Sequence, residues 1–149
     1  MKKLITLISA LSVVLIAGCS KDTAIQLNDV DKITLDLVST QKLPQGYSYI
    51  IKLTNGSSHV IKQNDVYLSY PTKVANGEMA NTFKVEANGN KLDIQPKDEF
   101  NLTVFVPVQS YVDYDKLQVD HPYAEIKGYL DTVSPETLFN SSGSILYGK

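Results

Sequence analysis

Short runs in which apolar and polar residues alternate dominate this chain of 149 residues, and they constrain its fold more than any other feature. A period of two places apolar side chains on one face of an extended strand and polar side chains on the other. After residue 18, no stretch of 12 or more residues shows the 3.6-residue apolar stripe of an amphipathic helix. The alternating runs cover residues 33–37, 47–54, 66–70, 83–87, 92–95, 100–106 and 124–130, and a last short run at 144–147 is expected to pair with 123–130.

Residues typical of turns separate these runs. Leu43-Pro44-Gln45-Gly46 predicts a reverse turn, because proline fixes φ and glycine adopts a positive φ. Asn88-Gly89-Asn90 predicts a hairpin between the runs on its two sides. Ser134-Pro135-Glu136 offers a cap and a first-turn proline, and it predicts a single helical turn over residues 135–139.

Seven or eight short strands in about 115 residues predict an all-β fold, an antiparallel two-sheet sandwich. A small open β-barrel is the alternative, because strand patterns alone do not decide closure. The layout resembles that of bacterial immunoglobulin-like lipoprotein domains over residues 33–147. Two segments carry the resemblance: a strand that ends in Leu53-Thr54-Asn55-Gly56-Ser57-Ser58, and Ile94-Gln95-Pro96-Lys97-Asp98 leading into the run at 100–106. The resemblance implies that Tyr123 forms a tyrosine corner, with its hydroxyl bonded to the backbone.

The N-terminus has the pattern of a secretion signal. Lys2 and Lys3 precede an uncharged and mostly apolar run at 4–17. At about 1.5 Å per residue, a helix of this length is shorter than the ~30 Å hydrocarbon core of a bilayer, so the run predicts a signal peptide and not a permanent membrane span.

The apolar run ends in Ile16-Ala17-Gly18-Cys19, which resembles the lipobox of bacterial lipoproteins: an aliphatic residue and two small residues before a cysteine. The resemblance implies that type II signal peptidase cuts after Gly18, and that the Cys19 sulfur carries a diacylglyceryl group with fatty acids such as palmitate. The expected parts are a signal peptide at 1–18, a lipidated cysteine with a flexible tether at 19–31, and a single β-sandwich domain at 32–149. The tether is expected to hold a short strand at 24–27.

Composition narrows the location and the partners. All 14 basic residues are lysines, set against 16 acidic residues, and a weakly acidic chain without arginine is a poor nucleic-acid binder. A single cysteine excludes an internal disulfide and a thiolate zinc cluster. The absence of arginine beside many Lys, Asn and Ile residues suggests a Gram-positive cell, where the lipid would hold the protein on the outer face of the cell membrane. In a Gram-negative cell, Ser20 would permit sorting to the outer membrane.

Two groups of polar residues were candidates for chemistry. Asp113, Asp115 and Asp120 lie near His121 and could hold a divalent cation, but a calcium loop beginning at Asp113 lacks the glycine and glutamate that its sixth and twelfth positions need. His59 is the other histidine, and it belongs to a different predicted loop. No motif marks a nucleophile beside either histidine. The sequence therefore predicts no metal, no cofactor and no enzymatic activity.

The chain has nine tyrosines. Tyr47, Tyr49 and Tyr70 fall on apolar faces and are expected in the core. A second group is expected nearer the surface, where tyrosines supply rigid contact area with a polar hydroxyl; it comprises Tyr67, Tyr111, Tyr114, Tyr129 and Tyr147.

These observations favour a membrane-anchored extracytoplasmic lipoprotein that acts as a non-catalytic binding or accessory module of the cell envelope. Its expected partners are the membrane, through the lipid on Cys19, and an envelope protein. A structural or inhibitory envelope protein that engages a protein partner is one alternative. A cell-wall hydrolase is another, and it would require a deep cleft that brings His59 or His121 within hydrogen-bond reach of a carboxylate.

Overall fold

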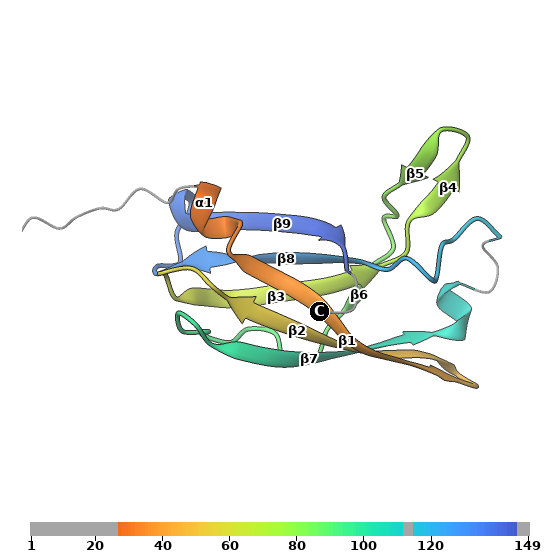
Figure 1. The fold of residues 1–149 in the computed structure, drawn as a ribbon, viewed down its shortest axis with the longest axis horizontal. Coiled ribbons are helices and arrows are strands. Elements are labelled where there is room, and N and C mark those ends of the chain that lie inside the picture. The colour runs from red at the N-terminus through yellow and green to blue at the C-terminus, as the bar shows by residue number, and fades with distance from the viewer. Residues whose placement is uncertain (1–26, 112–114, 146–149) are drawn as a thin grey trace, which may run out of the picture.

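A computed structural model describes residues 27–111 and 115–145. Two antiparallel sheets pack face to face (Figure 1). The first sheet has the order β1-β2-β7 and the second has the order β6-β3-β8-β9. The strands are β1 (Ile33–Leu43), β2 (Gly46–Asn55), β3 (Ile61–Ser69), β6 (Val85–Glu86), β7 (Glu99–Pro107), β8 (Tyr123–Leu130) and β9 (Leu138–Ser144).

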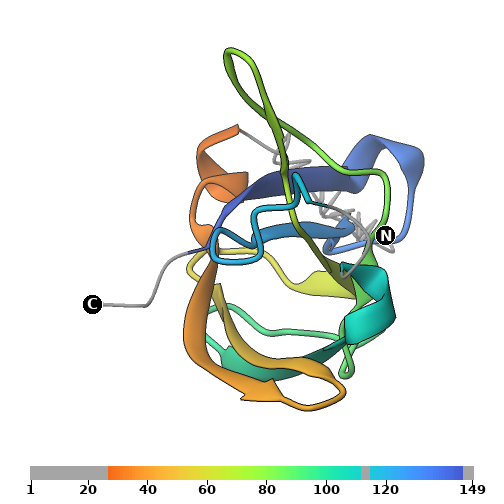
Figure 2. The same ribbon diagram turned by 90° about the vertical axis from the view of Figure 1, so that its right-hand side faces the viewer.

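The strand order confirms the predicted sandwich. Leaving aside the small hairpin described below, the first sheet takes the first, second and fifth strands, and the second sheet takes the fourth, third, sixth and seventh. This is the immunoglobulin-like Greek-key arrangement with its fourth strand moved onto the edge of the second sheet. Figure 2 shows the two layers on end. In the part of the chain that the structure describes, these two sheets are not joined by strand pairing, so the fold is a sandwich and not the small open β-barrel.

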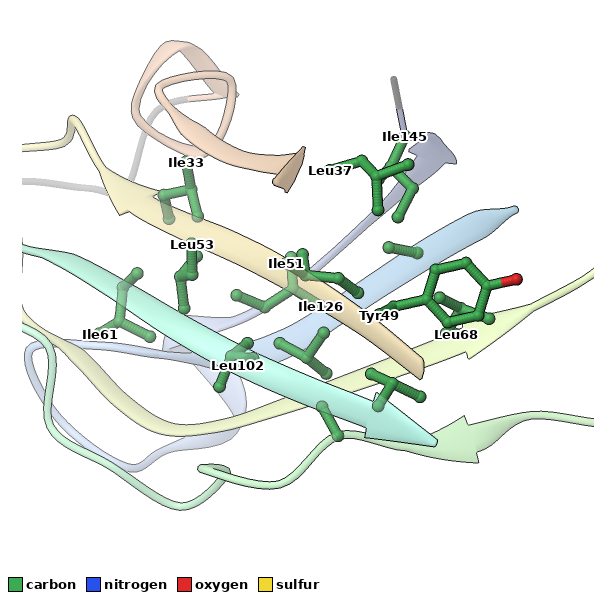
Figure 3. Close-up of a cluster of buried hydrophobic side chains, with 14 of the residues drawn as sticks. Ile33, Leu37, Tyr49, Ile51, Leu53, Ile61, Leu68, Leu102, Ile126 and Ile145 are labelled. Carbon is green, nitrogen blue, oxygen red and sulfur yellow. The ribbon is translucent and has the colours of Figure 1, made fainter. Parts of the chain in front are cut away.

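The core lies between the two sheets and follows the alternation read from the sequence. Along β2, every second side chain from Tyr49 to Leu53 is buried, and β7 repeats this pattern from Leu102 to Val106. Figure 3 shows these side chains meeting others from the opposite sheet, such as Leu68 and Ile126. Burial of such aliphatic side chains contributes about 1.5–3 kcal/mol each, which makes this layer the main source of stability.

Three local predictions were wrong. The hairpin at Asn88-Gly89-Asn90 does not form, because the chain on both sides of it pairs with the same strand: β6 pairs with the end of β3, and Ile94 bridges Ile61 at its beginning. Consequently residues 92–95 are not a strand. The last strand, β9, pairs with β8 as expected but covers residues 138–144, and the expected run at 144–147 lies partly outside the described residues. The Tyr123 hydroxyl forms no hydrogen bond within the described chain, so no tyrosine corner is present there.

Four short elements complete the fold. Helix α1 (Leu27–Val30) precedes β1 and lies within the segment predicted as a tether. The strand expected at 24–27 falls mostly outside the described residues, and Leu27, its last residue, is the first residue of α1. One 3-10 turn, η1 (Val108–Ser110), follows β7. Another, η2 (Pro135–Thr137), confirms the predicted helical turn. No helix in the described ranges is long and apolar enough to cross a bilayer. The fourth element is a hairpin of β4 (Thr72–Val74) and β5 (Gly77–Met79).

The two ends of the sandwich carry different elements (Figure 1). Helix α1 lies at one end, together with the β2–β3 and β8–β9 connections. The opposite end carries the β1–β2 turn, η1, the β4–β5 hairpin and the segment 115–122. For brevity we call these the α1 end and the hairpin end.

Candidate functional site

An open groove of about 850 Å³ lies at the hairpin end. Its walls are the β4–β5 hairpin and the segment 115–121, which backbone contacts hold together. The Lys73 N–H donates to the Lys116 carbonyl (2.9 Å), and the Gln118 N–H donates to the Pro71 carbonyl (2.9 Å). This volume falls within the range typical of ligand pockets. The lining residues on the hairpin are Thr72, Lys73, Val74, Ala75 and Met79.

The groove combines apolar side chains with charges of both signs. Met79 is 58% exposed and Val74 is 41% exposed, both on the hairpin wall. Half-buried Leu117 and Val119 pack against the core from the opposite wall. The charged lining residues are Lys73, Asp115, Lys116 and Asp120, together with His121. An exposed apolar strip with mixed charges beside it is typical of protein-binding surfaces.

The structure brings most of the predicted acidic cluster to this groove. Asp115, Asp120 and His121 all line it, whereas Asp113 lies outside the described residues. Among the described residues, the carboxylate paired with His121 is that of Glu78, whose Oε1 lies 3.5 Å from Nδ1, and His121 itself is largely exposed. Across the described ranges, no three His, Cys, Asp or Glu residues are placed to hold a metal ion.

His59 belongs to the β2–β3 connection, which lies at the α1 end of the sandwich. It is buried, its Nδ1 lies 2.6 Å from Asp131 Oδ2, and its Nε2 lies 3.5 Å from Asp29 Oδ2. The Val60 N–H also donates to Asp131 Oδ1 (2.9 Å). Partial burial acts to raise the pKa of Asp131, but the hydrogen bonds from His59 and Val60 outweigh it and hold that pKa below its ordinary value.

A hydrogen-bond network continues from His59 into the loop between β2 and β3. The buried Asn55 side chain donates to the carbonyls of His59 (2.8 Å), Ile94 (3.0 Å) and Gln95 (3.1 Å). Its Oδ1 accepts from the Ser57 hydroxyl at 2.7 Å. Because this hydroxyl bonds to Asn55 and to the His59 carbonyl, it does not face the imidazole as a nucleophile would.

A hydrolase would need a histidine that both lines a cleft and lies within hydrogen-bond reach of a carboxylate, and each histidine meets this requirement only in part. His59 lies within hydrogen-bond reach of a carboxylate, but it lines neither the groove nor the smaller slot described below. His121 lines the groove, but its contact with Glu78 is long.

Four tyrosines, Tyr47, Tyr49, Tyr70 and Tyr111, form a cluster toward the hairpin end. Tyr49 and Tyr70 are buried as predicted, and their hydroxyl groups lie 2.6 Å apart. Burial is the main cause that raises the pKa of Tyr49 to about 12, and it also raises that of Tyr70. Tyr47, expected in the core, is half-buried, and its ring centroid lies 5.4 Å from that of Tyr111.

The predicted tyrosine surface is less exposed than expected. Tyr67, Tyr111 and Tyr129 are half-buried, and Tyr114 and Tyr147 lie outside the described residues.

A slot of about 170 Å³ opens along one side of the sandwich, between the edge strands β1 and β9. Ile33 and Leu35 of β1 line it, with Ala124 and Ile126 of β8. Strand β9, on its far side, contains no charged residue. The sequence did not predict this slot, because its position depends on which strands form the edges of the two sheets.

The predicted anchor residues Ile16, Ala17, Gly18 and Cys19 lie outside the described residues. Lipidation of Cys19 and cleavage before it therefore stay predictions from the sequence.

Comparisons with known proteins provide no family. No protein-family profile matches the sequence, and no curated protein is significantly similar to it. Two of the similar solved structures are of a β-glucosidase from Kluyveromyces marxianus, one of them in complex with glucose; they have TM-scores of 0.35 and 0.36 and identities of 12% and 11%. Both matches cover 76% of this chain, which spans only 14% of the glucosidase chain.

A third similar structure is that of a structural-genomics target named SoR45. Its TM-score is 0.30 and its identity is 16%, with 76% of this chain and 83% of that chain covered. At TM-scores this low, none of the three likenesses carries an argument about function.

Proposed function

We propose that this protein is a lipid-anchored extracytoplasmic lipoprotein whose β-sandwich is a non-catalytic binding module, and that the groove at the hairpin end binds an envelope protein. The observation that carries the proposal is the position of the groove. It lies at the end of the sandwich opposite α1, the first described element of the chain. A domain held through its N-terminus would therefore present the groove away from the membrane.

The anchor follows from the lipobox. One acyl chain gives only reversible membrane binding, whereas the two or three chains of a processed lipoprotein hold a protein stably, because each buried methylene contributes about 0.8 kcal/mol. We place the protein on the outer face of a Gram-positive cell membrane, or in the outer membrane of a Gram-negative cell.

Labelling cells with radioactive palmitate tests the anchor. We expect the wild-type protein to incorporate the label and the Cys19→Ala variant to lose it. Label that persists in Cys19→Ala would refute the anchor.

A photo-cross-linking amino acid placed at Met79 tests the groove in intact cells. Met79 is the most exposed apolar side chain of the hairpin wall, so we expect it to yield one stoichiometric protein adduct. The same probe at Glu136 serves as the control, because that exposed residue belongs to η2 in the β8–β9 connection, which lies at the α1 end. Equal adducts at both positions, or none at Met79, would contradict a binding groove.

The uncharged edge strand β9 favours a second candidate, a structural or inhibitory protein that engages its partner by strand addition. Edge strands without charges or prolines are templates for pairing with another chain, and a strand added there would place side chains over the slot beside Leu35. A cross-linking probe at Ser142 distinguishes the two candidates, since an adduct there and not at Met79 would favour this second one.

A further inference from the structure

Three Asn-Gly pairs occur in the sequence, and the fold places them in different environments. They are Asn55-Gly56, Asn76-Gly77 and Asn88-Gly89. An asparagine can lose its side-chain amide when the next backbone nitrogen attacks the amide carbon, and a following glycine hinders this attack least because it has no Cβ. The reaction needs rotation of both the side chain and the backbone, so the surroundings of each pair decide which one reacts.

The first pair is held in the buried network at the α1 end. The Asn55 amide group donates to three backbone carbonyls, and its oxygen accepts from the Ser57 hydroxyl. The Gly56 nitrogen, which would have to attack, donates its own hydrogen to the Lys32 carbonyl at 2.9 Å. Reaction at Asn55 would therefore break all of these hydrogen bonds.

The third pair is exposed, but the chain beside it is fixed to both sheets. The Ala87 N–H donates to a carbonyl of β3 at 2.9 Å, and the Asn88 N–H donates to a carbonyl of β7 at 2.7 Å. A Cβ atom added to Gly89 would lie 3.0 Å from the side chains of Phe100 and Leu102, so these side chains pack closely against the glycine. The backbone rotation that the reaction needs is therefore restricted here as well.

The second pair, Asn76-Gly77, lies at the tip of the β4–β5 hairpin, which stands away from the sandwich (Figure 1). All residues from 73 to 80 are exposed. Apart from its chain neighbours, no described residue comes within 4 Å of a Cβ atom added to Gly77. The pairing of Val74 with Gly77 closes the turn, but the hairpin has only three residue pairs, and so short a two-stranded hairpin opens locally at little cost. The Gly77 nitrogen is therefore the most accessible of the three nucleophiles.

We propose that Asn76 is a site of spontaneous deamidation, and that this modification disrupts the groove at the hairpin end as the protein ages. Hydroxide removes the proton of the Gly77 nitrogen, which then attacks Cγ of Asn76. The bond from Cγ to the side-chain nitrogen breaks, and that nitrogen takes a proton from water and leaves as ammonia. Water opens the resulting cyclic imide at one of its two carbonyls and leaves an aspartyl or an isoaspartyl residue, with no oxidation or reduction.

Both products change the hairpin wall of the groove. Each adds a negative charge at the tip of the hairpin, and the isoaspartyl product also inserts a methylene group into the backbone of the turn. An extra backbone atom between Val74 and Gly77 disrupts the register that places Met79 opposite Thr72, and both of these residues line the groove. The expected loss of binding rests on the proposed function of the groove, whereas the modification of Asn76 does not.

Ageing of the purified full-length protein at mildly alkaline pH, followed by trypsin digestion and peptide mass spectrometry, tests the site. Cleavage after lysine places the three pairs on separate peptides, residues 53–62, 74–84 and 85–91. In the folded protein, we expect Asn76 to deamidate at least about tenfold faster than Asn55 and Asn88. In guanidinium chloride the three rates should converge, because each pair then has the same unfolded surroundings.

The variant Asn76→Gln tests the consequence for the groove, because ring closure onto the longer side chain is much slower. Wild type and variant, each with a photo-cross-linking amino acid at Met79, are added fresh or aged to cell envelopes. We expect ageing to reduce the adduct of the wild type and to leave that of Asn76→Gln unchanged.

The proposal is overturned if Asn76 reacts no faster than Asn88 in the folded protein, or if ageing affects the adducts of wild type and Asn76→Gln equally. Absence of an adduct with fresh protein would refute the binding groove and with it the loss of binding. It would leave the modification of Asn76 to be decided by the peptide masses alone.

Discussion

The two ends of this sandwich contain similar residue types but differ in what those residues contact. At the α1 end, His59 and Asn55 are buried, and their polar atoms meet partners within the protein. At the hairpin end, His121 and the acidic residues beside it border an open groove with exposed Met79. The comparison shows that a histidine near aspartates belongs to a buried hydrogen-bond network at one end of the fold and to a solvent-exposed surface at the other. Burial, which the sequence does not display, makes the difference.

Replacing Asn55 should have the largest effect, because it tests whether the α1 end is held by its polar network. Asn55→Ala removes the buried amide that donates to the carbonyls of His59, Ile94 and Gln95 and accepts from the Ser57 hydroxyl, which costs about 3 kcal/mol of unfolding free energy. Urea denaturation followed by circular dichroism measures this. Asn140→Ala, at an exposed position on β9, is the control and should change stability by less than about 0.5 kcal/mol. Equal losses in the two variants would show that the network contributes little.

The turn that begins β2 is tightly packed, although it lies at the hairpin end. A Cβ atom at Gly46 would lie 2.1 Å from the Val106 carbonyl oxygen, so Gly46→Ala must displace backbone and should cost about 2 kcal/mol. Gly143→Ala is the matched control, because nothing lies within 4 Å of its added Cβ. Thermal unfolding measures the melting temperatures of both variants. An unchanged melting temperature for Gly46→Ala would mean that the turn can move to accept a Cβ atom and is not tightly packed.

These two residues also show what the sequence could predict. The turn before β2 and most strands followed from alternation and from proline and glycine, because those signals act within a few residues. The role of Asn55 was visible only as the end of a strand, since its partners Ile94 and Gln95 lie about 40 positions away. Long-range contacts of this kind decide which polar residues are buried.

The two Asn-Gly pairs show that long-range contacts also decide where the candidate groove forms. Asn88-Gly89 predicted a hairpin that does not form, because the free edge of β3 pairs with the chain on both sides of it. Asn76-Gly77 was not singled out, yet β4 and β5 pair around it and form one wall of the groove. All residues of β5 are exposed, so no alternation pointed to this hairpin. The groove could not be predicted because its walls come from two segments whose pairing depends on the rest of the fold.

The Tyr49–Tyr70 pair tests the packing between the core and the hairpin end. Tyr70→Phe removes one hydroxyl of the 2.6 Å contact and should cost about 1 kcal/mol, whereas Tyr129→Phe, whose hydroxyl forms no hydrogen bond within the described chain, should cost less. Because burial raises the pKa of Tyr49 to about 12, its stabilising contribution is present below the ordinary value of 10 and is lost as the pH rises through about 12. Absorbance at alkaline pH should show this delayed ionisation, and titration of all tyrosines near their ordinary value would contradict it.

Acid should weaken the α1 end by a smaller amount. The lowered pKa of Asp131 means that its stabilising contribution is present above the ordinary carboxyl pKa and is lost as the pH falls through the lowered value. The half-exposed carboxyl limits the size of this effect, because solvent screens its charge. Stability measured by urea denaturation from pH 6 down to pH 3 should fall less steeply in Asp131→Asn than in the wild type. Parallel curves would show that Asp131 contributes nothing to the acid sensitivity.

The smallest effect on stability is expected at Met79, and it tests whether the hairpin end is built for binding. A side chain that is 58% exposed buries little area on folding, so Met79→Ser should change the unfolding free energy by less than about 0.5 kcal/mol. The same change removes an exposed apolar surface of the groove wall, so it should reduce capture of the envelope partner by cross-linking from a probe at the neighbouring Val74. A large loss of stability would mean that Met79 supports the fold. The hairpin end would then resemble the α1 end, and the difference between the two ends would be refuted.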